Sequence, residues 1–293
     1  MSPITFCIST HNNLNYLKIA VDSVRKNSYY TEAPFVIYAE NCTDGTNEWL
    51  RDNAERYNIQ YYIESNESPM GIGGGMNFCA DKVTTEFIMF LHSDFYVTKD
   101  WDIECVNQYR SENRNKLWIS SLRFEPAMFP DHEKYLNGTV RQPYDNIIVP
   151  RDFFGEYYHN FDSTTFDGYA EEFKKLNSYT IFKGQGVSGL VSKEDWDFIG
   201  GNDPQFSPTS WEDKDLFLRM INAGFSFTLT SKSIVYHFGA RGSHRLEENN
   251  NKTSQRQLQS EEANVYKFVS KWGGVPVYNE HHMIMGITPI KAR

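Results

Sequence analysis

The chain has 293 residues, enough to bury a sizeable hydrophobic core as one large domain or two small ones. Its 40% hydrophobic and 23% charged residues are typical of a globular protein and exclude extended disorder. The net charge of −9, with no basic stripe, argues against binding to nucleic acid or to anionic lipid.

The cysteines and the hydropathy of the chain indicate the cellular compartment in which the protein is expected. The four cysteines form no CxxC pair, which excludes the usual zinc and redox motifs, and buried reduced thiols suit a reducing compartment. No leader peptide and no apolar run of about 18 residues is evident. We therefore expect a cytoplasmic protein that does not span a membrane.

Strands and helices alternate through the first 122 residues. The pattern predicts strands at Ile4–Thr10, Phe35–Ala39, Ile59–Ile63, Glu86–Leu91 and Leu117–Leu122, and helices at Asn13–Asn27, Thr46–Tyr57, 71–83 and Trp101–Asn113. Such βαβ units predict an α/β fold, with a mostly parallel open sheet flanked by helices and buried on both faces.

Polar residues follow three of these strands. Thr10 and His11 come after the first, Glu40 and Asn41 after the second, and the His92–Ser93–Asp94 run after the fourth. In open α/β sheets, ligands bind beyond the carboxyl ends of the strands. We therefore expect these three groups to line a common site.

The second half is less regular. Residues 124–179 are rich in Pro, Asp, Tyr and Phe and are predicted to form long, partly irregular excursions over a substrate. Beyond them the pattern predicts strands at Val187–Val191, Phe225–Leu229 and Ile234–Phe238, and helices at Lys193–Ile199, Trp211–Ala223 and Ser254–Lys271. The last of these helices could pack on the domain or on a second subunit.

A glycine cluster runs from Gly71 through Gly73 to Gly75. It is not a dinucleotide fingerprint, because Met76 stands where the third glycine would be, and it is not a phosphate-binding P-loop, because the Gly-Lys-Ser/Thr triplet is absent. Two readings stay open. The cluster is either a tight turn or a backbone that approaches a ligand at a helix start.

Acidic and imidazole side chains supply the candidate chemistry. Asp94 either begins a turn or holds a divalent cation that bridges two phosphates. Glu212 and Asp213 open a helix, where the helix dipole stabilises acids, or one of them is a general base. His237 ends the last strand as a structural histidine or a ligand, with a polar cluster close behind at Arg241, His244 and Arg245.

Taken in order, these segments resemble family 2 glycosyltransferases with the GT-A fold over residues 3–245. The matching segments are ITFCISTHNNLNYLKIAVDSV, VIYAENCTDGTNEWL, MGIGGGMNFCAD, FIMFLHSDFYV, FKGQGVSGLVSKEDWDFIGGNDPQF, WEDKDLFLRMINAGF and VYHFGARGSH, with YKFVSKWG near the end. The resemblance implies a Rossmann-like nucleotide-binding half at 1–122, an acceptor half at 123–245 and a C-terminal helical extension at 246–293. The extension is the candidate oligomer interface.

The resemblance also implies roles for single residues. Thr10, His11 and Glu40, with Asn41 beside them, would bind the nucleoside, and Gly71, Gly73 and Asn77 belong to the matching glycine-to-asparagine segment. Ser93 and Asp94 would serve the ribose and the metal, and His237 would be a second metal ligand. Asp213 would be the catalytic base, with Glu212 beside it. His92 replaces the first aspartate of the family's DXD motif, which implies either weaker metal binding or a contact to ribose.

The implied activity is transfer of a sugar, with inversion, from a nucleoside-diphosphate sugar to a hydroxyl of a carbohydrate or glycoconjugate. The expected cofactor is Mn²⁺ or Mg²⁺, and UDP is the default nucleotide. Two alternatives stay open. A non-catalytic nucleotide- or sugar-binding module is kept open by His92. A nucleotidyltransferase is disfavoured, because the turn after the first strand, Ser9–Asn12, contains no glycine.

Overall fold

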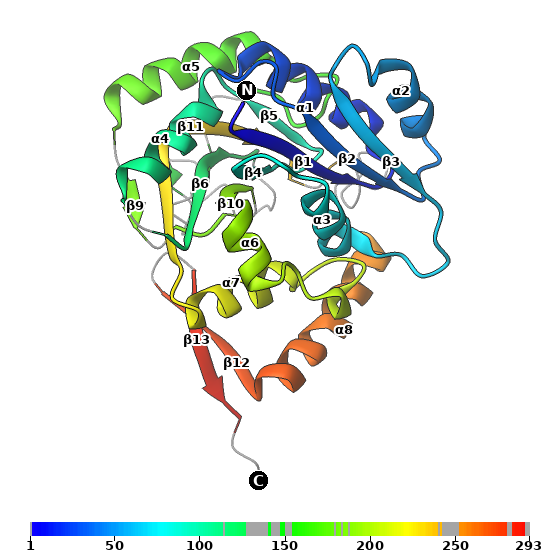
Figure 1. Cartoon of the computed structure of the whole chain (residues 1–293), viewed down its shortest axis with the longest axis vertical. Coiled ribbons are helices and arrows are strands. Elements are labelled where there is room, and N and C mark those ends of the chain that lie inside the picture. Colours follow the sequence, from blue (N-terminus) through cyan, green and yellow to red (C-terminus); the bar gives the residue numbers. More distant parts are fainter. Residues whose placement is uncertain are drawn as a thin grey trace.

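The structure is a computed structural model. It describes residues 2–113, 115–126, 140–141, 147–149, 154–178, 180–182, 184–186, 188–239, 241, 252–279 and 283–290. A central sheet is covered by helices on both faces, and a small hairpin projects at the C-terminal end (Figure 1). Among the described helices, none has the length and apolar character needed to cross a bilayer.

The described residues form an 11-stranded sheet. Its main path runs β3 (Ile59–Glu64), β2 (Phe35–Glu40), β1 (Ile4–Thr10), β4 (Phe87–Phe90), β10 (Gly189–Ser192), β6 (Leu117–Phe124), β11 (Ser226–His237) and β5 (Phe95–Val97). Three short strands attach beside this path: β7 (Val140–Arg141), β8 (Ile147–Val149) and β9 (Thr180–Phe182). The first four strands are parallel, and β6 and β11 are parallel to each other. Between these groups β10 runs antiparallel to β4 and β6. The α/β fold predicted from the sequence is confirmed, as a mixed, mostly parallel sheet.

Both faces of the sheet are buried. Successive residues of a strand point to opposite faces, so Phe6 and Ile8 of β1 join one core while Cys7 joins the other. The first core includes residues of α1 (Leu14–Asn27), α2 (Thr46–Asn53) and α4 (Trp101–Ser111). The second includes residues of α3 (Gly71–Asp81), α6 (Lys193–Ile199) and α7 (Glu212–Asn222). This two-sided burial explains why the strands read as continuous apolar runs rather than alternating ones.

Several elements differ from the sequence prediction, which did not include the short strands β5, β7, β8 and β9. Within the stretch predicted to be partly irregular, α5 (Ser163–Leu176) buries Phe166 and Ala170 in a third core. The two strands predicted after α7 are one strand, β11, whose register shifts between Thr230 and Ile234. After α8 (Gln255–Trp272) the chain forms a hairpin of β12 (Gly274–Tyr278) and β13 (Ile284–Pro289), which the sequence analysis missed. The four cysteines are free thiols, and three of them are buried as expected, whereas Cys42 is only partly buried.

Candidate active site

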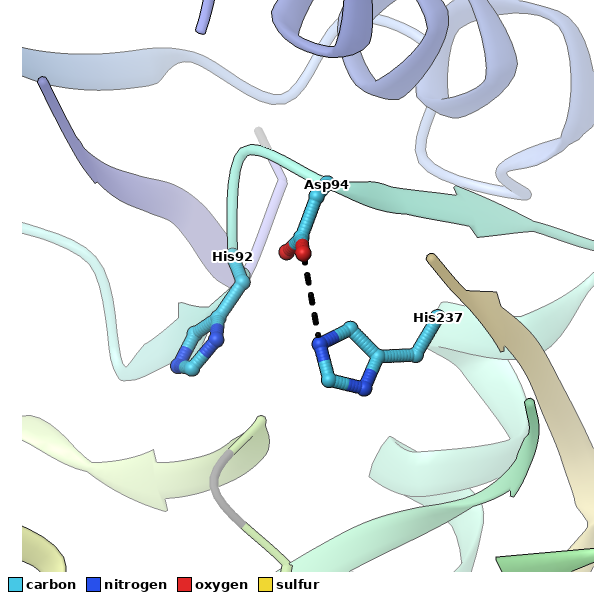
Figure 2. A group of neighbouring side chains, drawn as sticks. All are labelled: His92, Asp94 and His237. Atoms are coloured by element: carbon cyan, nitrogen blue, oxygen red, sulfur yellow. Dashed lines mark ion pairs between the residues drawn. The ribbon is translucent and has the colours of Figure 1, made fainter. Parts of the chain in front are cut away.

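His92, Ser93 and Asp94 occupy the link between β4 and β5, at the carboxyl end of β4. Because β5 pairs antiparallel with β11, the register sets His237 opposite Phe95. The Phe238 amide donates to the Asp94 carbonyl at 3.0 Å, which fixes the two backbones together. Residues more than 140 positions apart in the chain therefore meet, and Figure 2 shows His92, Asp94 and His237 around a common space.

His237 lies between two carboxylates. Its Nε2 is 3.4 Å from Asp94 Oδ2, and its Nδ1 is 2.7 Å from Glu125 Oε1. Burial alone lowers the pKa of His237, but the charges of Asp94 and Glu125, with hydrogen bonds to both, raise this pKa to about 9. In turn, burial opposes ionisation of Glu125, yet His237 and Arg123 bring the pKa of Glu125 below its usual value. The two carboxylates thus stabilise positive charge at this imidazole, whether a proton or a coordinated cation carries that charge.

His92 differs from His237 in its protonation. Burial lowers the pKa of His92 to about 4, against the opposing charge of Asp94. Its ring stacks on Phe95, with 5.4 Å between ring centroids. A neutral imidazole keeps one nitrogen lone pair free for coordination.

The three side chains have the chemistry of a divalent-cation site. One ligand atom from each of His92, Asp94 and His237 lies within 4.8 Å of the other two. A carboxylate with two imidazoles suits Mn²⁺ and similar ions. The Glu125 bond to Nδ1 of His237 matches the carboxylate–histidine pairing that orients metal-bound histidines. The residues therefore fit the cation that the sequence analysis expected, and they add His92 to the two predicted ligands.

Glu212 and Asp213 form the first turn of α7. The charge of Asp213 raises the pKa of His92, so it acts electrostatically within the same site. Asp213 Oδ1 accepts a hydrogen bond from the Lys214 amide at 2.8 Å. Glu212 Oε2 is buried and has no hydrogen-bond partner among the described residues. Burial, followed by the charge of Asp213, raises the pKa of Glu212 to about 8, so this carboxyl holds a proton at neutral pH.

Unsatisfied polar atoms lie at the end of β1. Thr10 Oγ1 and Asn13 Oδ1 are buried with no hydrogen-bond partner in the described part of the chain. Asn13 Nδ2 donates to Ser93 Oγ at 2.7 Å, which connects this end of β1 to the link after β4. His11 Nδ1 is 2.8 Å from the Glu40 carbonyl oxygen. Buried polar atoms usually have partners, so such atoms at a strand end are consistent with a polar ligand.

The Glu40 carboxylate is occupied within the protein. It accepts hydrogen bonds from the Asn66 side chain and from the amides of Met70 and Gly71, at 2.8–2.9 Å, and from the Tyr38 hydroxyl. Asn41 exchanges two hydrogen bonds with the backbone of Asn66. Both residues thus order the loop before α3, and their predicted contact with a nucleoside stays a prediction.

Gly71, Gly73 and Asn77 hold α3 against the chain that leads into α7. Gly71 has φ of +69°, and a Cβ added there would lie 2.0 Å from the Pro208 carbonyl oxygen. A Cβ on Gly73 would lie 3.1 Å from Asn202 Cβ. Asn77 exchanges two hydrogen bonds of 2.8 Å with the Asn202 backbone. The glycines therefore permit close packing between segments, and the predicted ligand contact of these residues stays a prediction.

Asn13 and Glu125 were not predicted from the sequence as site residues. Glu125 directly follows β6, whose parallel register with β11 pairs Phe124 with Tyr236 and brings the next residues, Glu125 and His237, side by side. Within the basic cluster predicted after β11, Arg241 is buried and donates to the Phe238 carbonyl at 3.0 Å. His244 and Arg245 lie outside the described residues.

Comparisons with known proteins agree on one fold. The sequence model of Glycosyl transferase family 2 matches residues 5–175, more than half of the chain. No curated protein matches. Among solved structures, GalNAc-T7 with UDP, GalNAc and Mn²⁺ is similar at a TM-score of 0.55 and 15% identity, over 80% of this chain and 43% of that one. S. aureus TarS is similar at a TM-score of 0.52 and 14% identity, over 81% of this chain and 37% of that one. TarS 1-349 in complex with UDP-GlcNAc gives 0.52 and 16%, over 80% and 57%. At these identities the likeness concerns the fold, and the chain spans about half the length of these proteins or less.

Proposed function

Because the chain belongs to glycosyl transferase family 2, we propose that it transfers a sugar from a UDP-sugar to an acceptor hydroxyl, with inversion and with a divalent cation. The observation that carries this proposal is the His92, Asp94 and His237 group at the carboxyl ends of β4 and β11. Two solved relatives at the level of fold contain UDP with GalNAc and Mn²⁺, or UDP-GlcNAc. A UDP-sugar is the donor class that these relatives suggest for this chain.

The donor side is assigned to the ends of β1 and β4. The unpartnered Thr10 Oγ1 and Asn13 Oδ1 would hydrogen-bond the nucleoside, and Ser93, already fixed by Asn13, would contact the ribose. His92, Asp94 and His237 would hold the cation, with Glu125 orienting His237. A cation bound there would neutralise the diphosphate and stabilise it as a leaving group.

The acceptor side is assigned to the start of α7. Asp213 takes the proton from the acceptor hydroxyl as its oxygen bonds to the anomeric carbon, while the bond from that carbon to the diphosphate oxygen breaks on the opposite side. Glu212, which keeps its proton at neutral pH, stands beside the base as a hydrogen-bond donor and adds no second negative charge. A positioned base contributes about 10²–10⁴-fold in rate.

The test combines nucleotide binding with turnover. UDP binding is measured by calorimetry with and without Mn²⁺, and UDP release from UDP-GlcNAc and UDP-GalNAc is measured in the same buffers. Asp94→Ala should abolish the Mn²⁺-dependent part of UDP binding. Asp213→Asn should keep UDP binding and lower turnover by about 10²-fold or more. Asp52→Asn, an exposed substitution in α2, is the matched control.

Two outcomes would refute the proposal in different parts. If Mn²⁺ leaves UDP binding by the parent protein unchanged, the cation site is wrong. If the parent binds UDP with Mn²⁺ but releases none from either donor, a non-catalytic binding module replaces the transferase.

A further inference from the structure

One face of α8 carries a stripe of polar side chains that all hydrogen-bond to the same segment of this chain. The stripe residues are spaced three or four positions apart, which sets them on one side of a helix. Each donates a hydrogen bond to residues 203–210, the segment that leads into α7; the stripe consists of Gln257, Ser260, Asn264, Lys267 and Lys271. Figure 1 shows α8 alongside the chain between α6 and α7.

The end of that segment has an uncommon backbone. Ser210 and Trp211 have φ of 76° and 75°, in the left-handed region that residues other than glycine seldom adopt. Trp211 is also the N-cap of α7, and its side chain makes no capping hydrogen bond. Two strained residues thus stand directly before Glu212 and Asp213. Such a conformation persists only where surrounding contacts impose it.

Asn264 makes more of these contacts than any other residue of the stripe. Its side chain is fully buried, and its Nδ2 lies 2.7, 2.8 and 2.9 Å from the carbonyl oxygens of Phe206, Thr209 and Ser210. An amide has two N–H groups, so the three carbonyls share two donors. The orientations of the Thr209 and Ser210 carbonyls, on either side of the first left-handed residue, are therefore set from α8.

The neighbours of Asn264 on α8 fix the same turn. Ser260 Oγ donates to the Thr209 carbonyl, and Gln257 Nε2 donates to Ser210 Oγ at 2.6 Å. Phe268, one turn along the helix, packs on the Trp211 ring with 5.0 Å between centroids. From the other side, the Ile72 amide donates to the Pro208 carbonyl at 3.0 Å. The turn is therefore clamped between α3 and α8.

We propose that Asn264 is a positioning residue that fixes the turn carrying Glu212 and Asp213, so that proton removal from the acceptor depends on it and donor binding does not. This inference rests on the proposed function. Asn264 touches neither the His92–Asp94–His237 group nor the ends of β1 and β4 in any described contact, which is why the two steps should separate.

The first test compares turnover with binding. Asn264→Ala should slow UDP release from UDP-GlcNAc at saturating donor and Mn²⁺ by about tenfold or more, because small misplacements of a reacting group cost up to about 10²-fold. The affinity for UDP with Mn²⁺ should stay within about twofold. Gln257→Ala, which removes one bond, should show a smaller fall in the same direction. Gln259→Ala removes an exposed glutamine of the same helix and should match the parent. A lower affinity with unchanged turnover would overturn the proposal.

A double-substitution cycle tests whether Asn264 acts through the base. In the Asp213→Asn background, Asn264→Ala should cause little further loss of turnover, because there is no base left to misplace. Losses that multiply would show that Asn264 acts elsewhere and would overturn the proposal. If Asp213→Asn itself leaves turnover unchanged, the base assignment fails instead, so the two failures are distinguishable.

Amide hydrogen exchange measures the positioning itself and needs no turnover. In Asn264→Ala and Gln257→Ala, the amides of Asp215 and Ile72, which donate to the Trp211 and Pro208 carbonyls of this turn, should exchange faster than in the parent, while those of β1 and β4 stay protected. In Gln259→Ala, the amides of Asp215 and Ile72 should exchange as in the parent. Unchanged exchange in both stripe variants would overturn the proposal even if no donor sugar is turned over.

Discussion

The raised pKa of Glu212 predicts a pH-dependent loss of stability that one substitution removes. In the unfolded chain this carboxyl loses its proton near pH 4.5, and in the folded protein it does so near pH 8, because burial and the charge of Asp213 oppose ionisation. Between these values the folded state holds the extra proton. Stability therefore falls as pH rises from 4.5 to 8, and is constant with respect to this group above that range.

The size of the effect follows from the shift. One pKa unit corresponds to about 1.4 kcal/mol, so a shift from 4.5 to about 8 sets a ceiling of about 5 kcal/mol. Glu212→Gln keeps the size of the side chain and has no proton to lose. The variant should match the parent near pH 4.5 and exceed it by a margin that grows up to pH 8. All other titrating groups are common to both proteins and largely cancel in the difference.

Urea unfolding at pH 5, 6, 7, 8 and 9 measures this margin for the parent and for Glu212→Gln. Glu194→Gln is the matched control, because Glu194 also lies in the first turn of a helix, α6, but is exposed. The control should differ from its parent by a small, constant amount. A Glu212→Gln margin that does not change between pH 5 and pH 9 would refute the reasoning that Glu212 is protonated at neutral pH.

Two further predictions concern the proposed metal site and the packing around glycines of α3 and α5. Glu125→Gln removes the charge that orients His237 and should weaken Mn²⁺ binding at fixed UDP by about 10–100-fold. The electron paramagnetic resonance of free Mn²⁺ measures this affinity. An unchanged affinity would contradict the orienting role of Glu125. Gly75→Ala should destabilise the fold by about 1–3 kcal/mol in urea unfolding, because the new Cβ would lie 2.9 Å from both Ser9 Cβ and Tyr38 Cδ1. Gly168→Ala, in α5, meets nothing within 4 Å and should instead stabilise by about 0.5–1 kcal/mol; equal effects of the two substitutions would count against the packing argument.

The sequence predicted most of the sheet because its strands are buried on both faces. Runs such as Ile4–Thr10 and Phe35–Glu40 are mostly apolar or β-branched and are buried along nearly their whole length. The bounds of the first strand were predicted to the residue, and the second was predicted one residue too short. The same reasoning pointed to Asp94, because polar residues directly after buried strands lie at the ligand-binding edge. His237 was proposed as a ligand from the resemblance to the family. The family assignment made from these motifs is confirmed by the match over residues 5–175.

What the sequence did not reveal depends on register and on polar contacts. Glu125 directly follows β6, which ends at Phe124 but was predicted to end at Leu122. Its position beside His237 could be recognised only from the β6–β11 pairing. The α5 helix was hidden in aromatic-rich chain, although Asp162 caps it and Phe166 and Ala170 have helical spacing. The stripe of α8 consists of polar side chains only, so the hydrophobic pattern of the helix does not reveal it. The role of these side chains can be inferred only once the segment that they hydrogen-bond, residues 203–210, is known.

The two sides of the site are built by different forces, and this affects how each should respond to substitution. The proposed cation ligands are placed by backbone pairing of β4, β5 and β11, which depends on the cooperative hydrogen bonding of the sheet and tolerates changes in single distant side chains. Glu212 and Asp213 are placed by a strained turn that side chains of α8 hold from outside the sheet. If Asp213 and the α8 contacts act as we propose, variation in α8 can alter acceptor chemistry while leaving the proposed donor site intact, which is a physical route by which proteins with one sheet could come to use different acceptors.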